Sequence, residues 1–493
     1  MIKCCFTYLW FFFVTIFQKI SWFLWPVKQE EQSKTLPMFA VLFLVSFVYN
    51  ILRTLKLTIL LAEPDLPSQA ISYLKIFAIM PAAIVFTWFT TKMQTALGQK
   101  RTFNWMNILF GVLFAILTLA ILPYKSFYKL SLPGQSELIT LINSWYITLF
   151  YVAAEMWSSI MLNMLCWGVI IEITKLSDSK RLYSVFSLSA NLATFAAGWW
   201  GSSTIEQQIH FFTGISHPTW EQSLLFQMII LWMVQGLTIL TFNYAMKQQA
   251  IDEQNSLDKK IQVSFIDSIK VAFSHPIIRS VSLMMISYNI IYHMIDVIHN
   301  DYVKDIFSNS PKLMNQYLNV INQYLGVFAI IFSWVLSGSF VRRFGLIYSL
   351  FLTPLMWLSL SLIDVLGSTG VFSFPLIKWA TVALPLHLLS LSLILSVGRA
   401  AKFTIFDTAK EMSFLGLSQQ DKRLGKASVD GLTSRFGKTG GAWLVIVLVG
   451  HGGQIFAALV PLKITIFIAY GLWFYSVVTL IKQLPKESLQ GDK

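Results

Sequence analysis

Twelve apolar stretches, each long enough to cross a bilayer as a helix, alternate with shorter polar segments along the chain. A helix needs about 20 apolar residues to cross the hydrocarbon core of a membrane. The longest polar interruption, Lys247–His275, divides the stretches six and six, and a second polar stretch, Lys402–Arg435, is expected to form a basic loop after the tenth. The pattern predicts spans at residues 37–61, 71–91, 102–122, 144–171, 182–201, 223–244, 278–299, 319–341, 345–365, 375–399, 437–459 and 461–481.

The first 25 residues are apolar and aromatic, are interrupted by Gln18 and Lys19, and end before Pro26. They lack the cleavage site of a signal peptide and the composition of a transit peptide. An interfacial helix is favoured over a further span. The predicted organisation is an N-terminal cytoplasmic or interfacial segment (1–36), an N-terminal six-helix half (37–246), a cytoplasmic linker (247–277), a C-terminal six-helix half (278–482) and a cytoplasmic tail (483–493).

Composition supports an all-α polytopic membrane protein. Of the 493 residues, 55% are hydrophobic and only 12% are charged, roughly half the charged fraction of a soluble domain. With both ends on the inner side, 28 of the 37 Lys and Arg residues fall on inner segments and seven, Lys75 among them, on outer ones. This asymmetry is the positive-inside rule, so the net charge of +13 does not indicate nucleic-acid binding. Cys4, Cys5 and Cys166 have no metal-binding spacing, and no metal or cofactor is expected.

Two six-span halves joined by a cytoplasmic linker are typical of major-facilitator-type transporters, in which the halves rock around a central site. Channels more often assemble from fewer spans per chain, and membrane enzymes usually carry a catalytic cluster at one face. The layout therefore favours a carrier.

Ionisable residues within spans are costly and mark functional sites. Arg53 and Lys56 share a face of the first span, where they could bind an anion or extend to the lipid headgroups. Glu155 lies mid-span in the fourth apolar stretch. It could make a structural hydrogen bond or pair with a cation in a cavity.

Asp296 lies near the outer end of the seventh span, with His293 and His299 three residues to either side. An ion-pair or proton-coupling role is favoured over a metal site. Lys410, in the segment Phe403–Ser413, is either a solvated loop charge or part of a substrate pathway.

The sequence RFGKTGG (435–441) lacks the glycine spacing and the preceding strand of a phosphate-binding loop. Its glycines are expected to allow close helix packing.

Lys56, Glu155, Asp296 and Lys410 fall in or just after spans one, four, seven and ten. These spans occupy equivalent positions in each three-helix unit. The signs run plus, minus, minus, plus. Helices at these positions line the cavity of such transporters, so Lys56, Glu155, Asp296 and Lys410 are predicted to converge on an anionic substrate.

At the same residues the chain resembles the nucleotide transporter family of plastids and obligate intracellular bacteria, the ATP/ADP translocases. The matching segments are PMFAVLFLVSFVYNILRTLK, LFYVAAEMWSSIMLNMLCWG, SDSKRLYSVFSLSANLATFAAG, KFTIFDTAKEMSFLGL and DKRLGKASVDGLTSRFGKTGG. The resemblance implies transport roles for Lys56, Glu155, Asp296 and Lys410. The chain departs from the family pattern in having Thr54 and Leu57 around the first lysine, Asp in place of Glu at 296, and His299 and Asn300 after it.

The sequence thus predicts a nucleotide carrier, not an enzyme, that exchanges ATP for ADP across a bacterial inner membrane as a monomer in the lipid bilayer. Arg53, Lys56 and Lys410 would bind the phosphates, Glu155 and Asp296 would balance the cations, and Asn191 would bind a base or ribose or serve helix packing. A proton-coupled nucleotide importer or an NAD/ADP exchanger is the alternative within the family. A membrane enzyme and a degenerate carrier acting as a receptor are the rivals from other classes.

Overall fold

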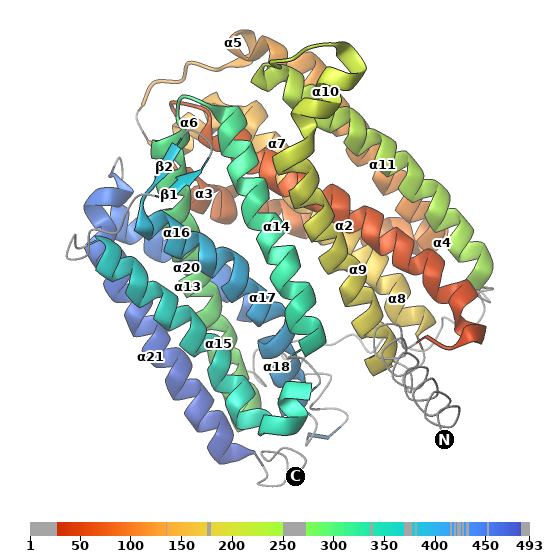
Figure 1. Cartoon of the computed structure of the whole chain (residues 1–493), viewed down its shortest axis with the longest axis vertical. Helices are drawn as coiled ribbons and strands as arrows, with labels where there is room; N and C mark the ends of the chain where they lie inside the picture. Colours follow the sequence, from red (N-terminus) through yellow and green to blue (C-terminus); the bar gives the residue numbers. More distant parts are fainter. Residues whose placement is uncertain are drawn as a thin grey trace, which may run out of the picture.

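The computed structural model is a bundle of long helices whose axes run roughly along one direction (Figure 1). It describes residues 27–134, 136–174, 179–249, 273–335, 339–368, 377–379, 382–414, 417–418, 421, 425, 428–429, 433–450 and 453–484. The predicted N-terminal segment 1–25, most of the linker, and the tail from residue 485 lie outside these ranges. In Figure 1 the long N-terminal helices α2, α4, α9 and α11 occupy one side of the bundle and the C-terminal helices α13, α15 and α21 occupy the other, while the short helices α3 and α6 lie beside the C-terminal group.

The helices cover nearly all of the described residues. The α-helices are α2 (Gln32–Leu61), α3 (Ala70–Tyr73), α4 (Met80–Ala115), α5 (Lys125–Tyr128), α6 (Glu137–Asn143), α7 (Trp145–Trp157), α8 (Trp167–Ile173), α9 (Ser179–Trp199), α10 (Ile205–Thr213), α11 (Trp220–Gln249), α13 (Pro276–Phe307), α14 (Pro311–Val335), α15 (Ser339–Ser368), α16 (Leu386–Leu393), α17 (Arg399–Ala401), α18 (Asp407–Ser413), α20 (Ser434–Val449) and α21 (Leu459–Gln483). Short 3₁₀ turns lie at Gln29–Glu31, Leu122–Tyr124 and Ile455–Ala458.

Wide π-helical turns interrupt several of these helices, at Leu74–Ile79, Ile116–Ile121, Ser158–Cys166, Trp200–Thr204, Ile394–Gly398 and Lys402–Phe406. Such turns are rare in proteins and are frequent at functional sites. Four of them contain or lie beside charged residues of the bundle interior, which are described below.

Eight helical segments among the described residues are long and apolar enough to cross a membrane. This confirms a polytopic helical membrane protein, but the predicted span at 375–399 was wrong at both ends. A two-stranded antiparallel hairpin, β1 (Ile377–Trp379) and β2 (Val382–Leu384), replaces its beginning, and Pro385, in extended conformation, stands before the helix. The helix then continues from Leu386 to Ser413, so the expected basic loop begins later than predicted.

The predicted spans 71–91 and 102–122 are two arms of one helical segment that turns at Gly98, where φ is +78°. Phe86 and Phe110, each twelve residues from the corner, stack with ring centroids 6.0 Å apart. In a straight helix they would lie about 36 Å apart, so the chain folds back on itself. Gly345, with φ of +84°, makes a second such corner within α15.

Replacing Gly98 by alanine is expected to destabilise the protein by roughly 1–3 kcal/mol, because a side chain at this φ and ψ is strained. Nothing lies within 4 Å of the added Cβ, so the effect isolates the backbone conformation. Thermal melting of the purified protein in detergent measures it. Gly236→Ala, at a helical position with equally open surroundings, is the matched control, and equal melting temperatures for both variants would contradict the prediction.

Glycines allow the two groups of helices to approach closely. A Cβ at Gly198 of α9 would lie 2.3 Å from the backbone nitrogen of Gln323 in α14, and one at Gly326 would lie 2.4 Å from that of Phe195. Farther along the chain, Cβ atoms at Gly437 and Gly441 would meet Asn289 at 2.8 Å and His293 at 3.1 Å. The packing role predicted for glycines at the start of α20 is confirmed at these two positions, and it brings α20 against α13.

Candidate functional site

An ion pair between α2 and α7 lies inside the N-terminal group. The Nζ of Lys56 is 2.5 Å from Oε1 of Glu155, and it also lies 4.8 Å from the centroid of the Tyr151 ring. The Lys56 side chain is 8% exposed and that of Glu155 is 29% exposed. Lys56 therefore points into the protein rather than toward the headgroups, and its carboxylate partner stays partly exposed.

Arg53 lies one turn before Lys56 and makes no hydrogen bond or ion pair with the described part of the chain. The carboxylates of Asp296 and Glu155 act on it electrostatically. Since Glu155 belongs to α7 and Asp296 to α13, Arg53 is influenced by acidic side chains of both groups of helices.

Asp296 pairs with Lys75, whose Nζ is 3.9 Å from Oδ2 of the carboxylate. The same Nζ is 2.6 Å from Nδ1 of His293, and Ser72 Oγ is 3.0 Å from Nε2. The assignment of Lys75 to an outer segment was wrong, because α3 begins at Ala70 and Lys75 follows it inside the helix. These contacts join the second predicted span to the seventh.

His299 does not share this network. Its Nε2 lies 3.2 Å from Ser392 Oγ, and no three His, Cys, Asp or Glu side chains gather as metal ligands in the described ranges.

The segment Leu386–Ser413 supplies further charges from within its helix. Lys402 pairs with Asp407 at 3.0 Å and lies over the rings of Tyr288 and Phe403, at 5.3 and 4.9 Å from their centroids. Lys410 is buried and lies 3.5 Å from Glu411 on its own helix. It lies two turns beyond Lys402 on the same helix, and Lys402 contacts the ring of Tyr288 in α13.

Lys438 of α20 also belongs to the site, although no role was predicted for it from the sequence. Its side chain is solvent-accessible, and the charges of Glu155, Lys402 and Lys75 act on it electrostatically. No hydrogen bond or ion pair engages it within the described ranges.

Together these side chains give the bundle interior an excess of positive charge. The cations Arg53, Lys56, Lys75, Lys402 and Lys438 outnumber the carboxylates Glu155, Asp296 and Asp407 by five to three. Unpaired charge in an enclosed site favours a ligand of opposite sign, so the arrangement suits a multiply charged anion.

Asn191 lies on α9 and donates from Nδ2 to the hydroxyl of Ser333 on α14, at 3.4 Å. This contact bridges the two groups of helices where they pack most closely. The structure therefore places Asn191 at a helix interface rather than among the charges.

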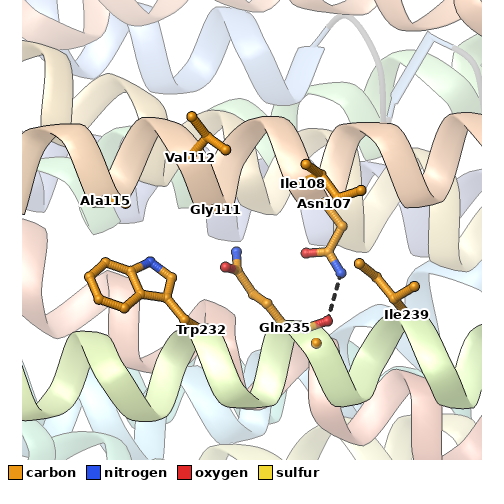
Figure 2. Close-up of a pocket in the computed structure, with 9 residues that line it drawn as sticks. Asn107, Ile108, Gly111, Val112, Ala115, Trp232, Gln235 and Ile239 are labelled. Carbon is orange, nitrogen blue, oxygen red and sulfur yellow. Dashed lines mark hydrogen bonds between the residues drawn. The ribbon is translucent and has the colours of Figure 1, made fainter.

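Two hollows lie away from these charges. One, of about 300 Å³, opens between α4 and α11 and is lined mainly by apolar side chains around Asn107 and Gln235. Figure 2 shows Asn107 donating to the backbone oxygen of Gln235, at 3.0 Å. The other, of about 580 Å³, is lined by Asp65, Glu137, Asp301 and Lys304 among others.

Comparisons with known proteins agree on one family. The sequence pattern of the TLC ATP/ADP transporters matches residues 14–484. Curated relatives include ADP,ATP carrier protein 1 of Chlamydia muridarum, 28% identical with 94% of this chain and 91% of that protein covered. ADP,ATP carrier protein 1 of Rickettsia conorii is 26% identical, with 94% and 96% covered.

Solved structures show the same fold at low identity. A bacterial homologue of the iron transporter ferroportin in an inward-facing state superposes with a TM-score of 0.55 at 13% identity, with 92% of this chain and 99% of that chain covered. A D-xylose–proton symporter gives a TM-score of 0.54 at 12% identity, with 92% and 98% covered.

Proposed function

Because the chain belongs to the TLC ATP/ADP transporter family, we propose that it exchanges ATP for ADP across a membrane by alternating access. The observation that carries this proposal is the interior cluster around Lys56 and Glu155, in which cations exceed carboxylates by two. A polyphosphate supplies the missing negative charge. The chain would act as a carrier and not as an enzyme.

The proposed architecture has twelve spans in two six-helix halves, like that of the major facilitators. Eight apolar segments support it, one of which turns back at Gly98 and so supplies two spans. The long helices α9, α14 and α20 supply the remaining three. The halves would be residues 37–246 and 278–482.

One set of contacts between the two halves lies at the side predicted to be outer. Lys304 donates to the backbone oxygens of Glu63, at 2.9 Å, and Leu66. Ser68 donates to Asp301, and Lys312 pairs with Glu206 at 2.9 Å. These contacts would form an outer gate that is closed in this conformation and must separate when the site opens outward.

We assign roles to the site residues in this cycle. Arg53, Lys56 and Lys410 would bind the phosphates, since arginine binds them bidentately and lysine as a point charge. Glu155 and Asp296 would balance the cations when the site is empty, so that the substrate competes with carboxylates and can leave. The Asn191 amide would steady the interface between the halves.

We place this carrier in a bacterial inner membrane. Its relatives come from Chlamydia and Rickettsia, both obligate intracellular bacteria, in which ATP taken in for ADP brings host energy into the cell. The protein would work as a monomer surrounded by lipid.

Proteoliposomes preloaded with ADP are expected to take up labelled ATP, and empty ones are not. Unlabelled ADP and ATP should compete, while other nucleotides and NAD should compete weakly. If the proteoliposomes take up neither nucleotides nor NAD, the carrier assignment is wrong.

The network of Asp296, Lys75 and His293 favours one alternative, a proton-coupled importer, because histidine and carboxylate groups can carry protons. Collapsing the proton gradient distinguishes the two cases. An exchanger keeps its rate under this treatment, whereas a symporter stops.

A further inference from the structure

Arg399 is a charged residue of the bundle interior that has no role in the transport cycle proposed so far. Its side chain is buried, with 6% of the residue exposed. It begins α17, between the π-helical turns Ile394–Gly398 and Lys402–Phe406. It is the last residue of the predicted span 375–399, so no role in the bundle interior was predicted for it.

Neighbouring residues hold Arg399 rigidly in place. A Cβ at Gly398 would lie 2.8 Å from the indole nitrogen of Trp357, so the helix packs directly on that ring. On the other side, Ala400 is buried against Leu325 and Ala329 of α14. The arginine backbone is thus fixed between α15 and α14.

The guanidinium of Arg399 stacks on aromatic rings and forms no ion pair with an acidic side chain among the described residues. Its central carbon lies 5.3 Å from the ring centroid of Tyr292 and 5.6 Å from that of Phe403. Nε and Nη1 are buried without a hydrogen-bond partner in that part of the chain. Unsatisfied donors on a buried cation are strongly unfavourable, and an incoming anion removes that cost.

Arg53, the N-terminal arginine already assigned to the phosphates, likewise makes no ion pair in the described ranges. Each half therefore contributes one such arginine.

Resting on the nucleotide carrier assignment, we propose that Arg399 and Arg53 form a two-arginine clamp for the phosphate chain, with one arginine contributed by each half. Guanidinium groups bind phosphate oxygens through paired N–H donors. A phosphate chain held by both arginines would draw the halves together, which couples loading to reorientation.

Arg399→Gln is expected to raise the KM for ATP exchange by about 10- to 100-fold, the size expected for losing hydrogen bonds to a charged group. Tripolyphosphate, which carries the charge without a base, should inhibit the wild type and lose that inhibition in the variant. Inhibition by adenosine should stay unchanged. Arg279→Gln, at an exposed arginine of α13, is the matched control.

If Arg399→Gln lost its inhibition by adenosine but kept its inhibition by tripolyphosphate, Arg399 would act on the base. That result would overturn the clamp. An unchanged KM in a folded Arg399→Gln protein would also overturn it. If that variant does not fold, Arg399→Lys keeps the charge without the paired donors, and an unchanged KM in this second variant would equally overturn the clamp.

The clamp and the carrier assignment fail separately. Tripolyphosphate is expected to raise the melting temperature of purified wild-type protein, and this shift should shrink in Arg399→Gln. A shift seen without any nucleotide exchange would leave the phosphate site standing and remove the carrier function. Nucleotide exchange without any shift in melting temperature would support the carrier function and remove the phosphate site.

Discussion

Replacing Lys56 by alanine is expected to lower ATP exchange by roughly 100-fold or more. The change leaves Glu155 without the ion-pair partner that lies 2.5 Å away. Removing one member of a buried ion pair costs about 3–5 kcal/mol, and each 1.4 kcal/mol is about a factor of ten. It also removes one cation from the proposed phosphate site. Initial rates of labelled ATP uptake, normalised to the amount of protein in the membrane, measure the effect.

Swapping the two charged side chains provides the control for this ion pair. Combining Lys56→Glu with Glu155→Lys restores the ion pair in reverse and should recover part of the rate that either single change removes. Lys100→Ala, at an exposed lysine beside the Gly98 corner, should leave exchange at the wild-type level. Wild-type exchange by Lys56→Ala would show that this ion pair has no part in transport.

Joining residues 68 and 301 covalently is expected to stop exchange almost completely. Ser68 and Asp301 contact one another across the proposed outer gate, and alternating access requires that contact to separate. Cysteines at both positions, in a protein whose Cys4, Cys5 and Cys166 are replaced by serine, can be joined by a short thiol-specific cross-linker that a reductant cleaves.

Exchange should fall in proportion to the cross-linked fraction and return after reduction. Each single-cysteine variant, treated with the same reagent, should retain its rate. Undiminished exchange by fully cross-linked protein would mean that this side of the molecule does not open during transport.

Hydropathy predicted the helical bundle well because apolar length is a local property. It could not find the end of the helix Leu386–Ser413, since Arg399, Lys402 and Asp407 make its second half look like a loop. Those charges are tolerated there because Lys402 pairs with Asp407 and Arg399 stacks on rings from its own segment and α13. The α13 partners are distant in sequence and invisible to a window of residues.

The candidate site was predicted where charge stood out against an apolar background. Lys56 and Glu155 were selected for that reason, and the structure pairs them. Lys438 was missed because it lies near a span end, where the positive-inside rule already accounts for a lysine. Lys75 was missed because it was assigned to an outer segment. Only the packing of α3 and α20 against α13 brings them inward.

The π-helical turns change how this chain should be aligned with its relatives. An i to i+5 hydrogen bond accommodates one residue more than the α-helical pattern, and one residue corresponds to roughly 100° of rotation about the axis. Two such turns flank Arg399, so a helical wheel drawn straight through this segment assigns Asp407 and Lys410 to the wrong faces. If a relative lacked one residue in one of these two turns, that turn could return to α-helical geometry. The residues after the deletion would then keep the same faces and contacts. Insertions and deletions of one residue at these turns can therefore be accommodated without rebuilding the bundle.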